Sequence, residues 1–253
     1  MTVSDIIKII EAEYPTDTAL DWDNVGLLVG DADAEVKKIL LALDATDDVI
    51  AQAVACQADL LITHHPLIFK GIRRVTTDDF VGRRVLTLAK QGISYYAMHT
   101  NYDVGGMGKE AAARMGLKET SLLEETGIGI KGVLEQEMSL QELSSRIKQK
   151  FALETVHVFG ELTHIVDRVA VVPGSGGSDI TEALEAGVDV LVTGDIDHHE
   201  GMDAALRGLA VIDAGHFGLE HIFAEAMERF LRQRIPAELP IIRAEETAPY
   251  RVI

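Results

Sequence analysis

The sequence predicts an α/β protein built from two similar α/β domains, the second inserted into the first. Short apolar, strand-like runs alternate with helical patterns along most of the 253 residues, which is typical of α/β architecture. His99 and His216 each follow such a run, and they could share a site only if the chain returned to its first domain. We therefore expect a discontinuous first domain, residues 1–126 plus 212–253, and an inserted domain, residues 127–211.

The first domain is predicted to begin with a helix and to continue as βα units. Residues 1–14 carry acidic residues within an apolar stripe, so they predict an amphipathic helix and not a signal peptide. Gly116 is placed to end the last helix of this series. The expected strands cover 39–43, 60–63 and 93–98, and the expected helices cover 46–57, 80–91 and 107–115.

The inserted domain and the return segment continue the alternation. Ser139 with Glu142 has the spacing of a capping box at a helix start. A long helix over 217–234 is expected to stop before Pro236, and the tail 248–253 is predicted to form an edge strand. The other expected strands cover 130–134, 155–159, 168–172, 188–193 and 210–213, and the expected helices cover 139–151, 178–186 and 198–207.

The two domains carry an internal similarity. Residues 41–63 lie on residues 171–193 without a gap when shifted by 130 positions. The identities are Ile50/Ile180, Ala53/Ala183, Asp59/Asp189, Leu61/Leu191 and Thr63/Thr193. Any two βαβ units share an apolar pattern, so these identities suggest a duplication without requiring one. At the matching strand ends, His64-His65 in the first copy corresponds to Gly194-Asp195 in the second.

Composition excludes several classes of protein. The chain has 41 acidic and 23 basic residues, a formal charge of −18, which argues against nucleic acid as the main partner because phosphate binding needs a basic face. The single cysteine, Cys56, rules out a disulfide within one chain. No apolar run approaches the roughly 20 residues of a membrane span. We expect a cytoplasmic protein without a membrane partner.

Three predicted strands end in side chains that bind metals. The three segments are Thr63-His64-His65-Pro66, His99-Thr100-Asn101-Tyr102-Asp103 and Gly215-His216-Phe217-Gly218-Leu219-Glu220. In open α/β sheets, ligands bind beyond the carboxyl ends of the strands. Imidazole nitrogens and carboxylate oxygens suit zinc, iron or manganese. Five or six such donors exceed what one catalytic zinc usually takes from protein, so we expect two divalent ions.

Spacing supports this interpretation at two of the three segments. Side chains of adjacent residues alternate in an extended chain, so His64 and His65 are suited to two ions. His216 and Glu220 are four residues apart and share one face of a helix. Each motif alone is more often structural, and it is their conjunction at strand ends that predicts a metal site.

Other polar motifs leave alternatives open. His198 and His199 follow Thr193-Gly194-Asp195 and are a second metal pair, a general acid in a pocket, or only the first turn of a helix. Trp22-Asp23-Asn24 is a structural turn or a substrate contact. The run 175–178, Ser-Gly-Gly-Ser, lacks the full P-loop pattern, which favours a tight turn over a phosphate cradle.

Together these motifs resemble the Nif-three-like family, whose members form hexameric rings with a dinuclear metal centre. Some members carry the label GTP cyclohydrolase type 2 homologue. The resemblance runs in the family's order from residue 22 to residue 220. It rests on Trp22-Asp23-Asn24-Val25-Gly26-Leu27, Thr63-His64-His65-Pro66-Leu67-Ile68-Phe69, His99-Thr100-Asn101-Tyr102-Asp103, Thr193-Gly194-Asp195 with His199, and Gly215-His216 with Glu220.

The resemblance implies a fold of two similar α/β domains, a toroidal homohexamer and a specific ligand set. The implied metal ligands are His64, His65, Asp103, His216 and Glu220. Asp103 and Glu220 would be the bridging carboxylates. His99 would be an additional ligand or a group beside the ligands.

The sequence thus favours a dinuclear-metal-dependent hydrolase of a small anionic substrate, such as a nucleotide. Metal binding lowers the pKa of water from 15.7 to roughly 7, and His99 or His199 is predicted to move protons as a catalytic residue. Opening of the GTP ring is the specific version that the family label suggests. The alternative is a non-catalytic metal-binding scaffold or regulatory ring protein.

Overall fold

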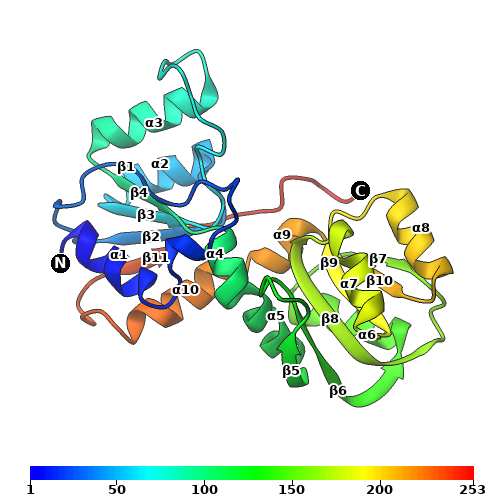
Figure 1. Ribbon diagram of the computed structural model, residues 1–253. Coiled ribbons are helices and arrows are strands. Elements are labelled where there is room, and N and C mark those ends of the chain that lie inside the picture. The colour runs from blue at the N-terminus through cyan, green and yellow to red at the C-terminus, as the bar shows by residue number, and fades with distance from the viewer. The chain divides into compact units, whose positions relative to one another are not determined.

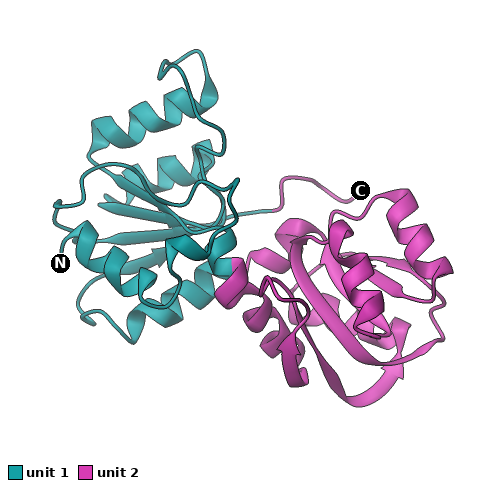
Figure 2. Cartoon of the chain, viewed as in Figure 1, with its two compact units in different colours: residues 1–102, 223–247 teal, residues 103–222, 248–253 magenta.

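The computed structural model describes residues 1–253, which form two compact units (Figure 2). Unit 1 comprises residues 1–102 and 223–247, and unit 2 comprises residues 103–222 and 248–253. Each unit contains one sheet, so the chain is an α/β protein in which the second unit interrupts the first. The boundaries differ from the expected 126/127 and 211/212. The reason is that α5 (Gly108–Met115) and α9 (His216–Glu220) pack against β8 (Ile165–Ser175) of unit 2.

Unit 1 contains a five-stranded sheet, and helices cover both of its faces (Figure 1). The strand order is β1-β4-β3-β2-β11, with only β1 antiparallel to its neighbour. The strands are β1 (Gly26–Val29), β2 (Ile39–Ala42), β3 (Leu60–Thr63), β4 (Ser94–Ala97) and β11 (Ile241–Arg243). The helices are α1 (Val3–Glu11), α2 (Asp47–Ala55), α3 (Phe80–Gln91), α4 (Thr100–Tyr102) and α10 (Phe223–Arg232), with a 3-10 turn at Thr16–Thr18. Helices α2 and α3 bury Val49, Ala53 and Leu88 against the apolar face of the central strands.

Unit 2 is a six-stranded mixed sheet in the order β5-β6-β8-β9-β10-β7. Only β8, β9 and β10 run parallel to one another. The remaining strands are β5 (Lys118–Leu122), β6 (Ile130–Ser139), β7 (His157–Phe159), β9 (Val190–Gly194) and β10 (Ala210–Asp213). The other helices are a π-helical turn (Asp103–Met107), α6 (Leu140–Lys150), a 3-10 turn (Gly177–Asp179), α7 (Ile180–Glu185) and α8 (His198–Leu206). Ala183 of α7 and Ala204 of α8 are buried against this sheet.

The long helix predicted over 217–234 is wrong, because two helices cover that stretch. Helix α9 ends at Glu220 and α10 begins at Phe223. The ring nitrogen Nδ1 of His221 lies 3.2 Å from the carbonyl oxygen of Phe217 and 3.0 Å from that of Gly218. A side chain that satisfies the last carbonyls of a helix helps to end it. No helix in the chain is both long and apolar enough to cross a membrane.

The edge strand predicted for residues 248–253 is also wrong. These residues form no strand and group with unit 2. The edge of the first sheet is occupied instead by β11, which pairs in parallel with β2 through Ile241 and Ile39. The sequence does not predict β1, β5 or β11. Strand β5 is exposed along its whole length, so it lacks the apolar signal of a buried strand.

The internal similarity extends to the backbone pairing. Ile39 of β2 pairs with Leu60 of β3, and 130 residues later Val169 of β8 pairs with Val190 of β9. Beyond these strands, the N–H of Ser94 in β4 donates to the carbonyl of residue 59, and the N–H of Ala210 in β10 donates to that of residue 189. The two units therefore repeat a βαβαβ core whose last strand leads into a short helix, α4 or α9.

Both copies of this repeat contain an aspartate that accepts the backbone N–H groups just before a strand. Asp59 Oδ2 accepts the N–H groups of residues 37–38 at 2.8 and 2.9 Å. Asp189 Oδ2 accepts those of residues 167–168 at 3.0 and 2.8 Å. Burial alone would raise the pKa of Asp189, but the hydrogen bonds from Arg168 and Asp167 outweigh it, so the pKa is lowered.

We expect Asp189→Asn to lower the free energy of unfolding by about 1 kcal/mol at neutral pH, since two backbone N–H groups lose a charged acceptor. The folded pKa lies below the unfolded value of about 3.9, so this stabilisation is complete above that value. It is lost as the pH falls through the folded pKa. Urea unfolding at pH 7 and pH 3 measures both effects. Asp167→Asn, which keeps the backbone donor and alters an exposed side chain, is the control; equal losses in both variants would contradict the account.

Candidate metal centre

Strand β3 delivers His64 and His65 to the carboxyl end of the unit 1 sheet. The turn that follows is held by Tyr95 of β4, whose hydroxyl lies 2.7 Å from Thr63 Oγ1 and donates to the carbonyl of His65 at 2.9 Å. The same hydroxyl accepts the N–H of Leu67 at 2.8 Å. Burial raises the pKa of Tyr95, so the hydroxyl stays protonated and the turn stays fixed.

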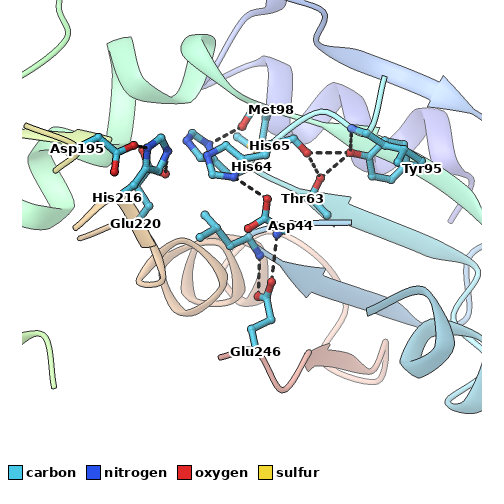
Figure 3. A network of polar contacts seen from close by, with 12 residues as sticks. Asp44, Thr63, His64, His65, Tyr95, Met98, Asp195, His216, Glu220 and Glu246 are labelled. Carbon is cyan, nitrogen blue, oxygen red and sulfur yellow. Dashed lines mark hydrogen bonds and ion pairs between the residues drawn. The ribbon is translucent and has the colours of Figure 1, made fainter. Parts of the chain in front are cut away.

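The two imidazoles are oriented through their Nδ1 atoms (Figure 3). His64 Nδ1 lies 2.9 Å from the carbonyl oxygen of Met98, and His65 Nδ1 lies 2.9 Å from Asp44 Oδ1. A carbonyl or carboxylate oxygen can only accept, so Nδ1 carries the proton in both rings. Nε2 of each neutral ring then holds the lone pair, which is the form that binds a metal.

His99 follows β4 and is oriented in the same way by Asp23. His99 Nδ1 lies 3.0 Å from Asp23 Oδ1, while Asp23 Oδ2 accepts the N–H and the hydroxyl of Thr100 at 3.0 and 2.6 Å. The Asp23 side chain is fully buried. Burial alone would raise the pKa of Asp23, but the hydrogen bonds from His99 and Thr100 lower it well below its usual range. Asp23 is therefore a carboxylate that fixes the ring of His99.

The three imidazoles of unit 1 form one cluster. One ligand atom from each of His64, His65 and His99 lies within 4.8 Å of the other two. Ring centroids are 4.9 Å apart for His64 and His65, 5.2 Å for His64 and His99, and 5.6 Å for His65 and His99. His64 is buried and the other two rings are partly buried. This set could hold a metal ion.

Unit 2 supplies a second set at the carboxyl end of β9 and the start of α9. His216 Nδ1 lies 2.9 Å from Asp195 Oδ2, and its Nε2 lies 3.0 Å from Glu220 Oε2 (Figure 3). With the proton on Nδ1, a nitrogen lone pair would face a carboxylate oxygen, and the two repel unless a cation or a second proton lies between them. Two donors that each lie about 2.1 Å from one ion can be 3.0 Å apart. The set therefore fits a metal ion.

Glycines allow the backbone to approach these ligands. A Cβ on Gly174 of β8 would lie 2.7 Å from Glu220 Oε1, and the residue has φ +83°. A Cβ on Gly194 would lie 2.4 Å from the backbone nitrogen of His216. The strand ends of unit 2 are thus shaped to admit α9, which explains why the second copy of the repeat has Gly194 where the first has His64.

The other two predicted site residues also lie in unit 2. Asp103 begins the π-helical turn Asp103–Met107 and is partly buried; such turns occur often at functional sites. A ligand atom of Asp103 lies within 4.8 Å of one from Glu220, so Asp103 belongs with the unit 2 set. His199 is exposed in the first turn of α8, with its ring 5.1 Å from that of His198. Asp197 caps this helix by accepting the N–H of His199 at 2.8 Å. The structural interpretation of His199 as a helix start is thereby accounted for, and its catalytic role stays a prediction.

Sequence reasoning missed Asp44, which follows β2 and binds His65. Its backbone is held by Glu246, whose carboxylate accepts the N–H groups of Leu43 and Asp44 at 2.7 and 3.0 Å (Figure 3). Burial raises the pKa of Glu246 although these hydrogen bonds oppose it. The available signal was an acidic residue at the end of a buried strand next to the one that carries the histidines.

Comparison with known proteins shows the family to which the chain belongs. The model of the Duf34/NIF3 (NGG1p interacting factor 3) family matches residues 1–249. The chain belongs to this family. A GTP cyclohydrolase 1 type 2 homolog of Clostridium perfringens is 34% identical over 97% of both chains, and one of Clostridium acetobutylicum is 38% identical over 87% of this chain and 85% of its own.

Solved structures of this family share the fold. A Staphylococcus aureus protein superimposes with a TM-score of 0.94 at 30% identity and covers 100% of this chain and 99% of its own. Reduced HcgD from Methanocaldococcus jannaschii gives a TM-score of 0.85 at 32% identity and covers 96% of this chain and 97% of its own. The resemblance inferred from the motifs is confirmed for this Duf34/NIF3 chain along nearly its full length.

Proposed function

We propose that this Duf34/NIF3 protein is a hydrolase that depends on two divalent metal ions and acts on a small anionic substrate such as a nucleotide. One observation carries the proposal: His64, His65, His99 and His216 each have Nδ1 hydrogen-bonded to an oxygen acceptor. Histidines that bind a metal are oriented in this way, with the other ring nitrogen donating to a carboxylate or a carbonyl. Zinc, iron and manganese all suit these donors.

The proposed ligands are His64, His65, Asp103, His216 and Glu220, with the two carboxylates bridging the ions. That the two units contribute to one centre is part of the proposal. It is supported by the chemistry of each set, because neither the imidazoles of unit 1 nor the one imidazole and two carboxylates of unit 2 would complete two ions. The toroid of six subunits that the resemblance implies also remains a prediction.

The charges of these residues favour an anionic substrate. Three neutral imidazoles and two carboxylates leave two divalent ions with a net charge of about +2, in a chain that is strongly acidic overall. Bound ions of this kind would supply a hydroxide nucleophile near neutral pH. His99 is the proposed catalytic residue for proton transfer, because Asp23 holds its Nδ1 proton and so leaves Nε2 to accept one. His199 is the second candidate for this role.

The rival function, a metal-binding scaffold without turnover, predicts that the polar residues beyond the ligands have no part in the site. Two observations favour the enzyme. Asp23 binds His99, and Asp195 binds His216. The names of the relatives suggest GTP as a substrate, and release of formate from GTP by the pure protein would test that version. Metal binding with no turnover of any phosphoester or nucleotide would favour the metal-binding scaffold over the hydrolase.

We expect Asp103→Asn to reduce turnover by more than about 100-fold. The reason is that a bridging carboxylate should matter at least as much as the outer partners of ligands, which typically contribute 10–100-fold. Initial rates with metal-loaded protein on a panel of nucleotides and phosphoesters measure the effect. Asp203→Asn, which alters an exposed acid on α8, serves as control. Unchanged rates in Asp103→Asn would refute the proposed mechanism.

A further inference from the structure

Two large aromatic side chains are exposed beside the histidine cluster of unit 1. Trp22 is 57% exposed and Phe69 is 46% exposed. Their ring centroids are 5.7 Å apart, and they lie 5.9 and 6.2 Å from the centroid of His99. Clustered apolar rings exposed to water mark binding sites more often than scattered ones do. This aromatic corner, Trp22 with Phe69, therefore borders the proposed reaction site.

The aromatic corner is held rigidly although its rings are exposed. Asp23, the residue after Trp22, is fixed by His99 and Thr100. The next residue, Asn24, donates from its side-chain amide to the carbonyl of Ile68, directly before Phe69. Both aromatic residues thus sit on backbone that is anchored to the sheet and to each other. A preorganised surface loses little entropy when it binds a ligand.

Phe69 also lines a cavity of about 510 Å³ in unit 1. The wall of the cavity includes His65, with the cationic side chains of Lys70 and Arg84. Arg84 is partly engaged, since its Nε lies 2.6 Å from Asp47 Oδ1. The carboxylates in the wall are also engaged: Asp44 binds His65, and Asp79 caps α3 by accepting the N–H of Gly82 at 2.8 Å.

The segment around this cavity is positively charged, although the chain as a whole is negatively charged. Residues 70–84 contain five basic and two acidic residues, whereas the whole chain carries −18. A local positive field on an acidic protein attracts anions to that place and repels them elsewhere. Phe69 belongs both to the aromatic corner and to the wall of this cationic cavity. A ligand that contacts both must therefore combine a flat ring with an anionic group.

We propose that the aromatic corner stacks on the nucleobase of the substrate while the phosphates lie at Lys70 and Arg84. This inference rests on the proposed function and adds the substrate class and its orientation. An aromatic side chain can stack on any of the nucleobases, because each base has a π face. The ring is thereby held next to His99 and His65, where the chemistry is proposed to occur.

Trp22 is the only tryptophan of the chain, so its fluorescence reports directly on the aromatic corner. We expect GTP and guanosine to quench it saturably, and tripolyphosphate to compete with GTP without quenching. Phe69→Leu should weaken GTP binding about tenfold, which is within the range for loss of one stacking partner. Lys70→Ala should weaken GTP but leave guanosine unchanged. Leu206→Ala, an exposed apolar residue of α8, is the control and should alter neither titration.

Two outcomes would overturn the inference. One is the absence of quenching by GTP, ATP and UTP at millimolar concentration, and the other is equal quenching by tripolyphosphate, which has no ring. Turnover is measured separately on the same samples. Quenching without turnover would support the base site and reject the hydrolase. Turnover without quenching would support the hydrolase and reject the base site.

Discussion

Replacing Glu220 by Gln, or His64 by Ala, is expected to lower the affinity for divalent metal by more than about 100-fold. Glu220 is 2% exposed and His64 is fully buried, so no water-exposed group can take over the lost donor atom. A ligand that binds an ion directly should contribute more than an outer partner, whose loss typically costs 10–100-fold. Glu220→Gln keeps the size of the side chain and removes the charge, which separates coordination from packing.

The measurement is the metal content per chain after dialysis against a weak chelator, with thermal unfolding run in parallel. Bound metal should raise the unfolding temperature of the native chain and not that of the variants, because a ligand stabilises only the state that binds it. His164→Ala removes an exposed imidazole and should behave like the native chain. Full metal retention in Glu220→Gln would show that this carboxylate is not a ligand.

The second large effect is expected at Asp23, which binds no metal in our account. Its buried carboxylate accepts four hydrogen bonds, two from Thr100, one from His99 and one from the backbone N–H of Asn24. In Asp23→Asn the amide nitrogen must face one of these donors, so at least one buried group is left unsatisfied. We expect a loss of about 3 kcal/mol in the free energy of unfolding. His99 would also lose the acceptor that fixes its tautomer, which should reduce turnover about 10–100-fold.

Chemical unfolding and the pH dependence of turnover test this prediction together. A residue that only stabilises the fold would lower the unfolding free energy and leave the pH profile of the surviving activity unchanged. A residue that positions His99 would shift that profile as well. Asp21→Asn, an exposed neighbour, controls for the loss of one negative charge. An unchanged profile in Asp23→Asn would restrict Asp23 to the fold.

Much of the fold could be predicted because local pattern and tertiary structure agree. The strands at 60–63 and 210–213 lie where the apolar runs put them. The capping box at Ser139 and Glu142 forms as its spacing predicts. The repeat was visible because Asp59 and Asp189 serve the same purpose in both units. In each case one short stretch of sequence contains the whole signal.

The partners of the histidines could not be predicted in this way. Asp44 reaches His65 only because β2 and β3 are parallel neighbours in a register that aligns their ends. Asp23 reaches His99 across 76 residues. The break before α10 depends on His221 turning back onto its own helix, which periodicity does not reveal. Such contacts follow from tertiary register and not from local sequence.

We propose that one chain binds two metal ions through side chains of both units. Anomalous diffraction from crystals of the protein, recorded at the absorption edges of zinc, iron and manganese, tests it most directly. The account predicts two peaks per chain, about 3.5–4 Å apart as in other two-metal sites, within bonding distance of His64, Asp103 and Glu220. No peak, or a single peak bound by one unit alone, would contradict it.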